Sequence, residues 1–491
     1  MHRKKTLSLG LAAAVVASTA VAGASQAAMS DTARAASGSP HWGPCSETAT
    51  TRLECSTLQV PLDYRDPDGR QIGIAVSRLA SKNPSKRRGV LLVNPGGPGL
   101  SGLGYPFALA AAGLPQKVQD SYDLIGFDPR GVGRSTPVTC DLTAEQQQSR
   151  PAYAHNAADV AQEAVRARAV ARQCATSKTS WMLPHTTTMN TARDMDRIRT
   201  ALGESKISYF GGSYGTSLGS VYTTLFPRRS DRIVLDSNLG PGGYDITSTR
   251  QFARGMQERF PDFAAFAAAH PAYGLGATPA QVTAKYYELA ERLEKKPVRG
   301  VDGTRFRTDT FDQLYLDANL PLLARTWQAL DTDRPLPPRP PSAGDPDNEV
   351  SSRYYVTCNN GRWPKTVGAY VRHTAVDRQK YPMLGGSTAN IGPCAFWPDA
   401  RTERQVRIGD RGPSNVLMVQ NERDPGTPLS GAGELRQAFG KRAVMVTADQ
   451  GGHGVYPTTA NTCANDAVTA YLTTGKRPMK DLACPAEQPG T

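Results

Sequence analysis

Short apolar runs alternate with helical patterns along most of the chain. Examples of the runs are GVLLVN, YDLIGF, KISYF, DRIVLD and NVLMVQN. Continuous apolar runs of this length are typical of strands that are buried on both faces of a parallel sheet. A helical pattern covers 190–204, with Asn190 as the expected N-cap and Gly203 as the stop. The alternation therefore predicts an α/β fold with a mostly parallel sheet flanked by helices.

The pattern changes at two places along the chain. Residues 53–81 alternate around the turn-forming stretch RDPDGR, which predicts a β-hairpin. Residues 245–405 carry long helical stretches such as RQFARGMQERFPDFAAFAAAH where further strands would be expected. We therefore expect a core formed by 41–244 and 406–491, with an inserted, mainly helical cap at 245–405 over one end of the sheet.

The N-terminus has the pattern of a secretory signal. HRKK supplies positive charge, the following stretch LSLGLAAAVVASTAVAGA is apolar, and small residues near Ala27 suit a signal peptidase. The alternative is a membrane helix, but the stretch is short, rich in alanine and not followed by basic residues. We expect a signal peptide at 1–28, a leader or pro-segment at 29–40, and a secreted, extracellular protein without membrane attachment after the signal is removed.

Eight cysteines fit an exported protein, because an even number in an oxidising compartment indicates disulfides. The sequence alone leaves about 105 pairings open. A zinc site is not expected, since the chain has no Cys-x-x-Cys pair and no His-Glu-x-x-His motif. Neighbours along the chain are the expected partners: Cys45 with Cys55, Cys140 with Cys174, Cys358 with Cys394, and Cys463 with Cys484.

The net charge of +13 comes from basic residues that are spread along the chain. A nucleic-acid partner is therefore not expected, because such binding needs clustered charge. No Gly-x-Gly-x-x-Gly stretch opens a helix and no Gly-Lys-Ser/Thr sequence is present, so we expect no nucleotide and no other cofactor or metal. We expect the protein to be a monomer.

The stretch YFGGSYGTSLG carries the first sign of chemistry. Ser213 lies in a Gly-x-Ser-x-Gly pattern between an expected strand and an expected helix. This context is typical of a sharp turn that exposes a nucleophilic serine, and the glycines avoid clashes in that turn. An ordinary glycine-rich loop is the alternative interpretation.

A serine needs a base and an acid to become a nucleophile. His453, in the loop DQGGHG after the last long strand, is the expected base, and His185 is the second choice. Asp424 ends the preceding strand and is the expected acid, because the chain order Ser, Asp, His suits this architecture. Asp236, which ends the strand after the serine turn, competes for the acid role.

The loop NPGGPG at 94–99 can supply donors for an oxyanion. We assign these donors to the backbone N–H groups of Gly97 and of Tyr214, the residue after the nucleophile. Asp128 and Arg130 in FDPRGVGRS are expected to brace the loops around the site.

Six motifs occur in the order NPGGPG, GFDPRGVGRS, TARDMDRIRTALGE, GGSYGTSLG, NERD and GGHG. With these motifs, the chain from about Cys45 to Cys484 resembles the secreted tripeptidyl aminopeptidases of actinomycetes, relatives of the prolyl iminopeptidases with the α/β-hydrolase fold. The resemblance implies a serine exopeptidase that removes short peptides, typically tripeptides, from free N-termini of peptides or proteins. It also implies Ser213, Asp424 and His453 as the catalytic triad.

The chain departs from this family at two places. Gly212 and Ser217 stand where relatives often carry valine and tyrosine. In VTCNNGRWP at 356–364, relatives carry acids around the cysteine, and if those acids hold the substrate's ammonium group, this chain holds it with other residues. Glu258 and Asp262 on the insertion are candidates, with a solvated helix face as the alternative. The neutral residues in this stretch are Thr357, Asn359 and Asn360.

Three functions fit a serine turn of this kind. In an exopeptidase, the insertion would close the far end of the cleft, so that only a free N-terminus could enter. A secreted carboxylesterase would use the same triad and oxyanion hole, and an acid-lined pocket would separate the two. A binding module that has lost its activity is disfavoured, because it would not need all three parts of a triad.

Overall fold

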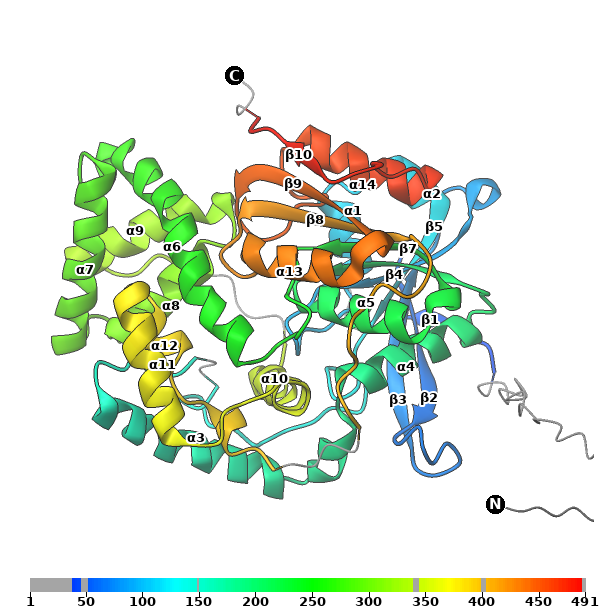
Figure 1. The fold of residues 1–491 in the computed structure, drawn as a ribbon, viewed down its shortest axis with the longest axis horizontal. Helices are drawn as coiled ribbons and strands as arrows, with labels where there is room; N and C mark the ends of the chain where they lie inside the picture. The colour runs from blue at the N-terminus through cyan, green and yellow to red at the C-terminus, as the bar shows by residue number, and fades with distance from the viewer. Residues whose placement is uncertain (1–37, 46–51, 148–149, 339–343, 399–402, 488–491) are drawn as a thin grey trace, which may run out of the picture. The chain divides into compact units, whose positions relative to one another are not determined.

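The computed structural model describes residues 38–45, 52–147, 150–338, 344–398 and 403–487. In this part of the chain the strands form one ten-stranded sheet, with the order β1-β2-β3-β5-β4-β6-β7-β8-β9-β10 (Figure 1). The strands are β1 (Gly43–Pro44), β2 (Glu54–Pro61), β3 (Gln71–Leu79), β4 (Gly89–Asn94), β5 (Tyr122–Phe127), β6 (Ile207–Gly212), β7 (Ser230–Asp236), β8 (Val416–Arg423), β9 (Ala443–Gly451) and β10 (Leu482–Cys484).

The sheet is mostly parallel, which confirms the fold class expected from the apolar runs. Three neighbouring pairs at one edge are antiparallel: β1 with β2, β2 with β3, and β3 with β5. All other neighbouring strands in the sheet run parallel. The expected hairpin is present, with Glu54 of β2 opposite Arg78 of β3. Since β6, β7, β8 and β9 are neighbours and parallel, their carboxyl ends share one edge of the sheet.

Helices cover both faces of this sheet. Successive residues of β4 enter different cores: Leu92 lies in the core shared with α4, α5 and α13, and Leu91 in the core shared with α1, α2 and α14. Both faces of β4 are buried in apolar cores, and its sequence is therefore a continuous apolar run. The helices around the sheet are α1 (Tyr105–Ala111), α2 (Gln116–Ser121), α4 (Thr188–Ala201), α5 (Tyr214–Leu225), α13 (Leu429–Phe439) and α14 (Thr462–Thr474).

Helices α6 to α12 lie in the chain between β7 and β8 and gather on one side of the sheet (Figure 1). The first four of them, α6 to α9, have a core of their own around Trp327, which is fully buried with its ring centroid 5.0 Å from that of Phe263 and 5.6 Å from that of Tyr286. The helices are α6 (Ile246–Ala268), α7 (Pro279–Lys295), α8 (Gly303–Gln313), α9 (Leu320–Asp331), α10 (Pro346–Asn360), α11 (Val367–Lys380) and α12 (Gly385–Thr388).

One helix from the first part of the chain joins this cap. α3 (Ala157–Thr176) packs against α11 and against the short 3-10 helix η6 (Pro393–Ala395). Its buried residues Val160 and Ala164 share a small core with Tyr370 and Ile391. The helical layer over the sheet therefore draws on residues before the nucleophile as well as on the segment between β7 and β8.

The expected helix at 190–204 begins earlier than the sequence indicated. α4 starts at Thr188, and Thr187 is its N-cap, with a side chain that accepts from Asn190 N–H. Asn190 is therefore not the N-cap. Threonine and asparagine both cap helices well, so the local pattern did not separate them. Gly203 follows the helix with a φ of 72°, as a stop residue requires.

The signal peptide expected at 1–28 lies outside the described residues, as does most of the leader expected at 29–40. Within the described ranges, the structure contains no helix that is both long and apolar enough to cross a membrane.

Candidate active site

Ser213 stands at the junction of β6 and α5. Its backbone has a φ of 55° and a ψ of −123°, a conformation that costs a residue with a side chain on the order of 1–3 kcal/mol. The flanking glycines make the turn possible. A Cβ on Gly211 would lie 2.6 Å from Gly215 O, and a Cβ on Gly215 would lie 2.9 Å from Asn94 O. Such strain and close packing are typical of the turn that presents a nucleophilic serine.

Asp424 and His453 are in direct contact after β8 and β9. His453 Nδ1 lies 2.9 Å from one carboxylate oxygen of Asp424 and 3.0 Å from the other. The carboxylate is fully buried and also accepts the backbone N–H groups of Gly426 and Thr427, each at 2.8 Å. With Nδ1–H donated to Asp424, Nε2 is the ring nitrogen left for proton transfer.

The electrostatics of His453 suit a base that must become charged during a reaction. Burial by itself lowers the pKa of the imidazole, but the neighbouring Asp424 carboxylate outweighs burial and raises that pKa above its ordinary 6.5. Two contacts fix the ring's place. The backbone N–H of His453 donates to Tyr315 O at 2.7 Å, and the two ring centroids are 4.7 Å apart.

The nucleophile and the histidine share the carboxyl-terminal edge of the sheet, which is where open α/β sheets bind their ligands. Asp236, at the end of β7, connects the two elements. Its backbone oxygen accepts Ser213 N–H at 2.9 Å, and its carboxylate accepts Val455 N–H at 2.9 Å and Tyr456 N–H at 2.7 Å. Asp236 therefore binds the histidine loop, the segment that carries His453 and continues to Tyr456. It does not bind the imidazole, which is held by Asp424.

The loop at 94–99 lies directly against the serine turn. A Cβ on Gly96 would come within 2.5 Å of Gly212 O and 3.0 Å of Tyr214 N, so only glycine fits there. Asn94 Oδ1 accepts Gly96 N–H at 3.0 Å, which removes that group as an oxyanion donor. Gly97 and Tyr214 remain the candidate donors.

The two bracing residues have the contacts expected of them. Asp128 Oδ1 accepts Ser101 Oγ at 2.6 Å and Gly102 N at 2.9 Å, which holds the segment after the 94–99 loop. Arg130 is fully buried and pairs with Asp194. His185, the second choice for the base, belongs to this region, where its backbone oxygen accepts from Arg130 Nη1 at 3.1 Å.

A cavity opens between α3, α6, α10 and the segment 387–394. It offers about 120 Å³ to water-sized molecules, and about 960 Å³ when the open space at its mouth is included. Arg353 on its wall places Nε 3.4 Å from Pro98 O of the oxyanion loop. A row of rings in tilted and edge-to-face contact leads from the cavity to His453, with centroids 4.7–5.6 Å apart: Phe252, Phe311, Tyr315 and His453.

The cavity also has a polar part of its lining. Glu163 lines it and is buried, and burial raises the pKa of its carboxyl group above the ordinary value, with Arg166 partly offsetting this. Ser387 also lines it; its hydroxyl is fully buried and finds no hydrogen-bond partner among the described residues. Glu163 was not among the acids predicted from the sequence, because those were expected on the insertion and α3 precedes the insertion in the chain.

The two acids predicted to bind the substrate amine do not line this cavity. Glu258 is bound by Arg254 Nε at 2.7 Å, one turn away on α6. Asp262 pairs with the buried Arg259, and Arg423 Nε lies 3.1 Å from its carboxylate. Both carboxylates are therefore satisfied by arginines, and the structure gives them a structural role. The solvated helix face considered as the alternative accounts for Glu258.

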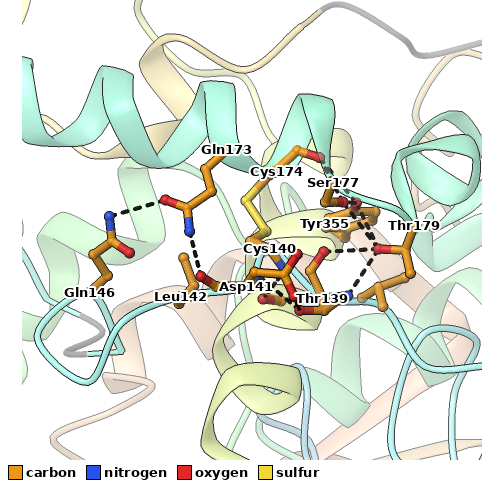
Figure 2. Close-up of a disulfide and its surroundings, with 12 residues drawn as sticks. Thr139, Cys140, Asp141, Leu142, Gln146, Gln173, Cys174, Ser177, Thr179 and Tyr355 are labelled. Carbon is orange, nitrogen blue, oxygen red and sulfur yellow. Dashed lines mark hydrogen bonds between the residues drawn. A yellow bond between two sulfur atoms is a disulfide. The ribbon is translucent and has the colours of Figure 1, made fainter.

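Four disulfides join neighbouring cysteines along the chain, in the expected pairs. Cys140–Cys174 ties the segment after β5 to the C-terminal end of α3, beside Ser177, Thr179 and Tyr355 (Figure 2). Cys358–Cys394 joins α10 to η6, and Cys394 lines the cavity. Two of the four bonds thus hold elements that form the cavity.

Comparison with known proteins gives consistent matches. Residues 381–484 match the family model for TAP-like protein. The tripeptidyl aminopeptidase of Streptomyces lividans is 36% identical over 474 residues, which cover 92% of this chain and 88% of that protein. Serine protease Hip1 of Mycobacterium tuberculosis is 30% identical and covers 90% of each chain. Carboxylesterase B of Mycobacterium tuberculosis is 32% identical over 90% of this chain and 89% of that protein.

Proposed function

Because the chain belongs to the tripeptidyl aminopeptidase family of α/β-hydrolases, we propose that it is a secreted serine exopeptidase that releases tripeptides from free N-termini. The named relatives support the assignment of the chain as a serine hydrolase that acts as a peptidase. What we add is that the released peptide is a tripeptide and that the protein is secreted. The observation that carries the first is the cavity with a buried carboxylate in its wall.

The triad would act in two steps. Ser213 Oγ attacks the carbonyl carbon of the scissile peptide bond while His453 Nε2 takes its proton, and Asp424 stabilises the imidazolium that forms. The N–H groups of Gly97 and Tyr214 receive the oxyanion. The imidazolium then gives its proton to the leaving amine, so that the C-terminal part of the substrate departs. Water, deprotonated by His453, then attacks the acyl-enzyme; the bond from Ser213 Oγ to the carbonyl carbon breaks, His453 returns the proton to Ser213 Oγ, and the N-terminal peptide is freed.

The cavity is placed to hold the N-terminal side of the substrate. Its wall at Arg353 touches the loop at 94–99, and Glu163 and Ser387 also line it. An arriving ammonium group would stabilise the ionised form of Glu163, which burial alone disfavours. Three extended residues span at most about 10 Å, so the distance from the carboxylate to the serine would set the length of the released peptide.

The arginines that line the cavity do not argue against an ammonium ligand. Arg150 Nη1 lies 2.6 Å from Asp312, and Arg353 Nη2 lies 2.9 Å from Glu349. The third, Arg166, lies 3.7 Å from Glu163 itself, a loose pairing that leaves the carboxylate free to accept a closer partner.

Secretion is supported by two features. The N-terminal sequence has the charge and apolar pattern of a signal peptide. The four disulfides persist best in an oxidising compartment.

A carboxylesterase is the second candidate, because carboxylesterase B is 32% identical over most of both chains. The same serine, histidine and oxyanion donors serve ester hydrolysis. The two candidates differ in the need for a charged N-terminus. An ester substrate has no ammonium group to offer Glu163, whereas a peptide substrate of an aminopeptidase does.

Matched substrates and variants test the proposal. We expect a free tripeptidyl anilide to be cleaved far faster than its N-acetyl form, because acetylation removes the ammonium charge. Glu163→Gln should raise KM for the free substrate roughly tenfold to a hundredfold and leave the slow cleavage of the acetylated one unchanged. Glu258→Gln, another cap glutamate paired with arginine, is the control and should behave as the parent.

Equal rates for the free and acetylated substrates would contradict the exopeptidase proposal and favour the esterase. A preference for the free substrate that survives in Glu163→Gln would keep the exopeptidase but move the amine site elsewhere.

A further inference from the structure

Asp236 has a buried carboxylate that the reaction above does not use. It is the last residue of β7, the strand between the one that carries Ser213 and the one that leads to Asp424. Only 1% of its surface is exposed. Its two oxygens accept Val455 N–H at 2.9 and 3.0 Å and Tyr456 N–H at 2.7 Å.

The residue next to it extends this link. Ser237 Oγ accepts the backbone N–H of Gly454 at 2.7 Å and lies 3.1 Å from Asp236 Oδ1. Three consecutive N–H groups that follow His453 therefore point at the end of β7. Such a row of N–H groups favours an anion, as in backbone nests.

Asp236 also holds the serine turn. The backbone oxygen of Asp236 accepts Ser213 N–H at 2.9 Å. Ser213 and Ser237 both have positive φ, 55° and 60°, values that residues with side chains adopt only when the surroundings enforce them. The end of β7 is thus held on one side to the serine turn and on the other to the histidine loop.

The charge on Asp236 also reaches the histidine. Burial raises the pKa of Asp236 to about 6, against the opposing effect of the N–H groups of Tyr456 and Val455. The charged carboxylate in turn contributes to the raised pKa of His453, after the larger effect of Asp424. The other titratable group that faces it is Tyr105 of α1, which burial keeps neutral.

We propose that Asp236 is a positioning residue of the catalytic centre, which fixes the histidine loop relative to Ser213 and adds its negative charge to that of Asp424 in stabilising the His453 imidazolium. Asp424 orients the ring through Nδ1, and Asp236 orients the backbone that carries the ring. A merely structural tie would hold the loop equally well without affecting the proton affinity of the imidazole.

The test uses Asp236→Asn, which keeps the shape but removes the charge and presents an N–H₂ group to one of the backbone donors. Asp231→Asn is the matched control, because Asp231 lies at the other end of β7 and pairs with Arg88. Two readouts are combined: the pH profile of p-nitrophenyl ester hydrolysis, which does not depend on tripeptide specificity, and NMR titration of His453 in a Ser213→Ala background.

For Asp236→Asn we expect kcat to fall about tenfold or more with KM within about threefold. The pKa of His453 should fall by roughly half to one pH unit, and the acid limb of the rate profile should move to lower pH. Asp231→Asn should match the parent in both readouts. A parental kcat, or an unchanged His453 titration in folded Asp236→Asn, would overturn the proposal.

Ser237→Ala tests the backbone link separately, and it carries the test if Asp236→Asn does not fold. It removes the acceptor of Gly454 N–H but no charge. We expect a severalfold loss of kcat with KM and the His453 titration unchanged. A parental kcat in this variant would overturn the positioning role.

Discussion

At the scale of single residues, the contact between Asp424 and His453 raises the pKa of the histidine that we propose as the base. The chain order of motifs was enough to predict these two residues and Ser213. The sequence could not assign Asp236, because it ends a strand in the same way as Asp424. What separates them is the path of the histidine loop, which places the ring over Asp424 and the following N–H groups over Asp236.

The raised pKa of His453 predicts an acid limb in the pH profile. A general base must be neutral, so kcat/KM should fall as the pH drops through the pKa of His453, which lies above 6.5 in this site. Asp424→Asn removes the charge that raises this pKa, and burial then lowers it. We expect the limb to move to lower pH and kcat to fall by about a thousandfold or more.

Measurement of kcat/KM between pH 4 and 9 for both proteins checks this prediction. An acid limb at the same pH in the Asp424→Asn variant would show that a different group controls the profile.

At the scale of elements, the packing of α6 supports the shape of the loop after β8, which carries Asp424. Gly255 of this helix packs so closely that a Cβ would lie 2.2 Å from the backbone oxygen of Pro425, next to Asp424. Apolar spacing predicted the helix, but nothing in that spacing indicates which of its residues meets a backbone. The same limit explains why the sequence does not indicate Glu163: no local pattern shows that α3 packs against the cap.

A matched pair of glycine substitutions tests this contact. Gly255→Ala should lower kcat/KM about tenfold and lower the melting temperature, because the methyl group forces α6 away from the Asp424 loop. Gly433→Ala, in α13, meets no atom within 4 Å and should keep its activity. Its stability should rise by about 0.5–1 kcal/mol, since alanine favours a helix over glycine.

Kinetics and thermal unfolding of the two variants give the comparison. Full activity in Gly255→Ala would show that the cap and the Asp424 loop are not coupled through this contact.

At the scale of the whole molecule, the cap and its disulfides form the cavity that we propose for the substrate. The mostly parallel sheet and the pairing of cysteines were within reach of the sequence, because each depends on local patterns and on proximity along the chain. The cavity was not, since its walls come from helices that are far apart in sequence: α3, α6 and α10.

Removing two of the disulfides one at a time distinguishes an effect on stability from an effect on substrate binding. Cys358–Cys394 closes 36 residues beside the cavity, and Cys463–Cys484 closes 21 residues away from it. Replacing either pair by serine should cost about 3–4 kcal/mol of unfolding free energy. Only the loss of Cys358–Cys394 should also raise KM for a free tripeptidyl substrate, because Cys394 and Thr357 line the cavity.

Denaturant unfolding and steady-state kinetics of the two double variants check this prediction. Equal effects on KM would show that the cavity does not depend on the bond at its wall.

The most direct test of the central claim is the mass of the first product released from an unblocked decapeptide. We predict that the parent enzyme releases the N-terminal tripeptide, that the N-acetylated decapeptide stays intact under the same conditions, and that Ser213→Ala releases nothing. Release of internal or C-terminal fragments, cleavage of the acetylated peptide at the same rate, or release of tripeptide by Ser213→Ala would contradict the account.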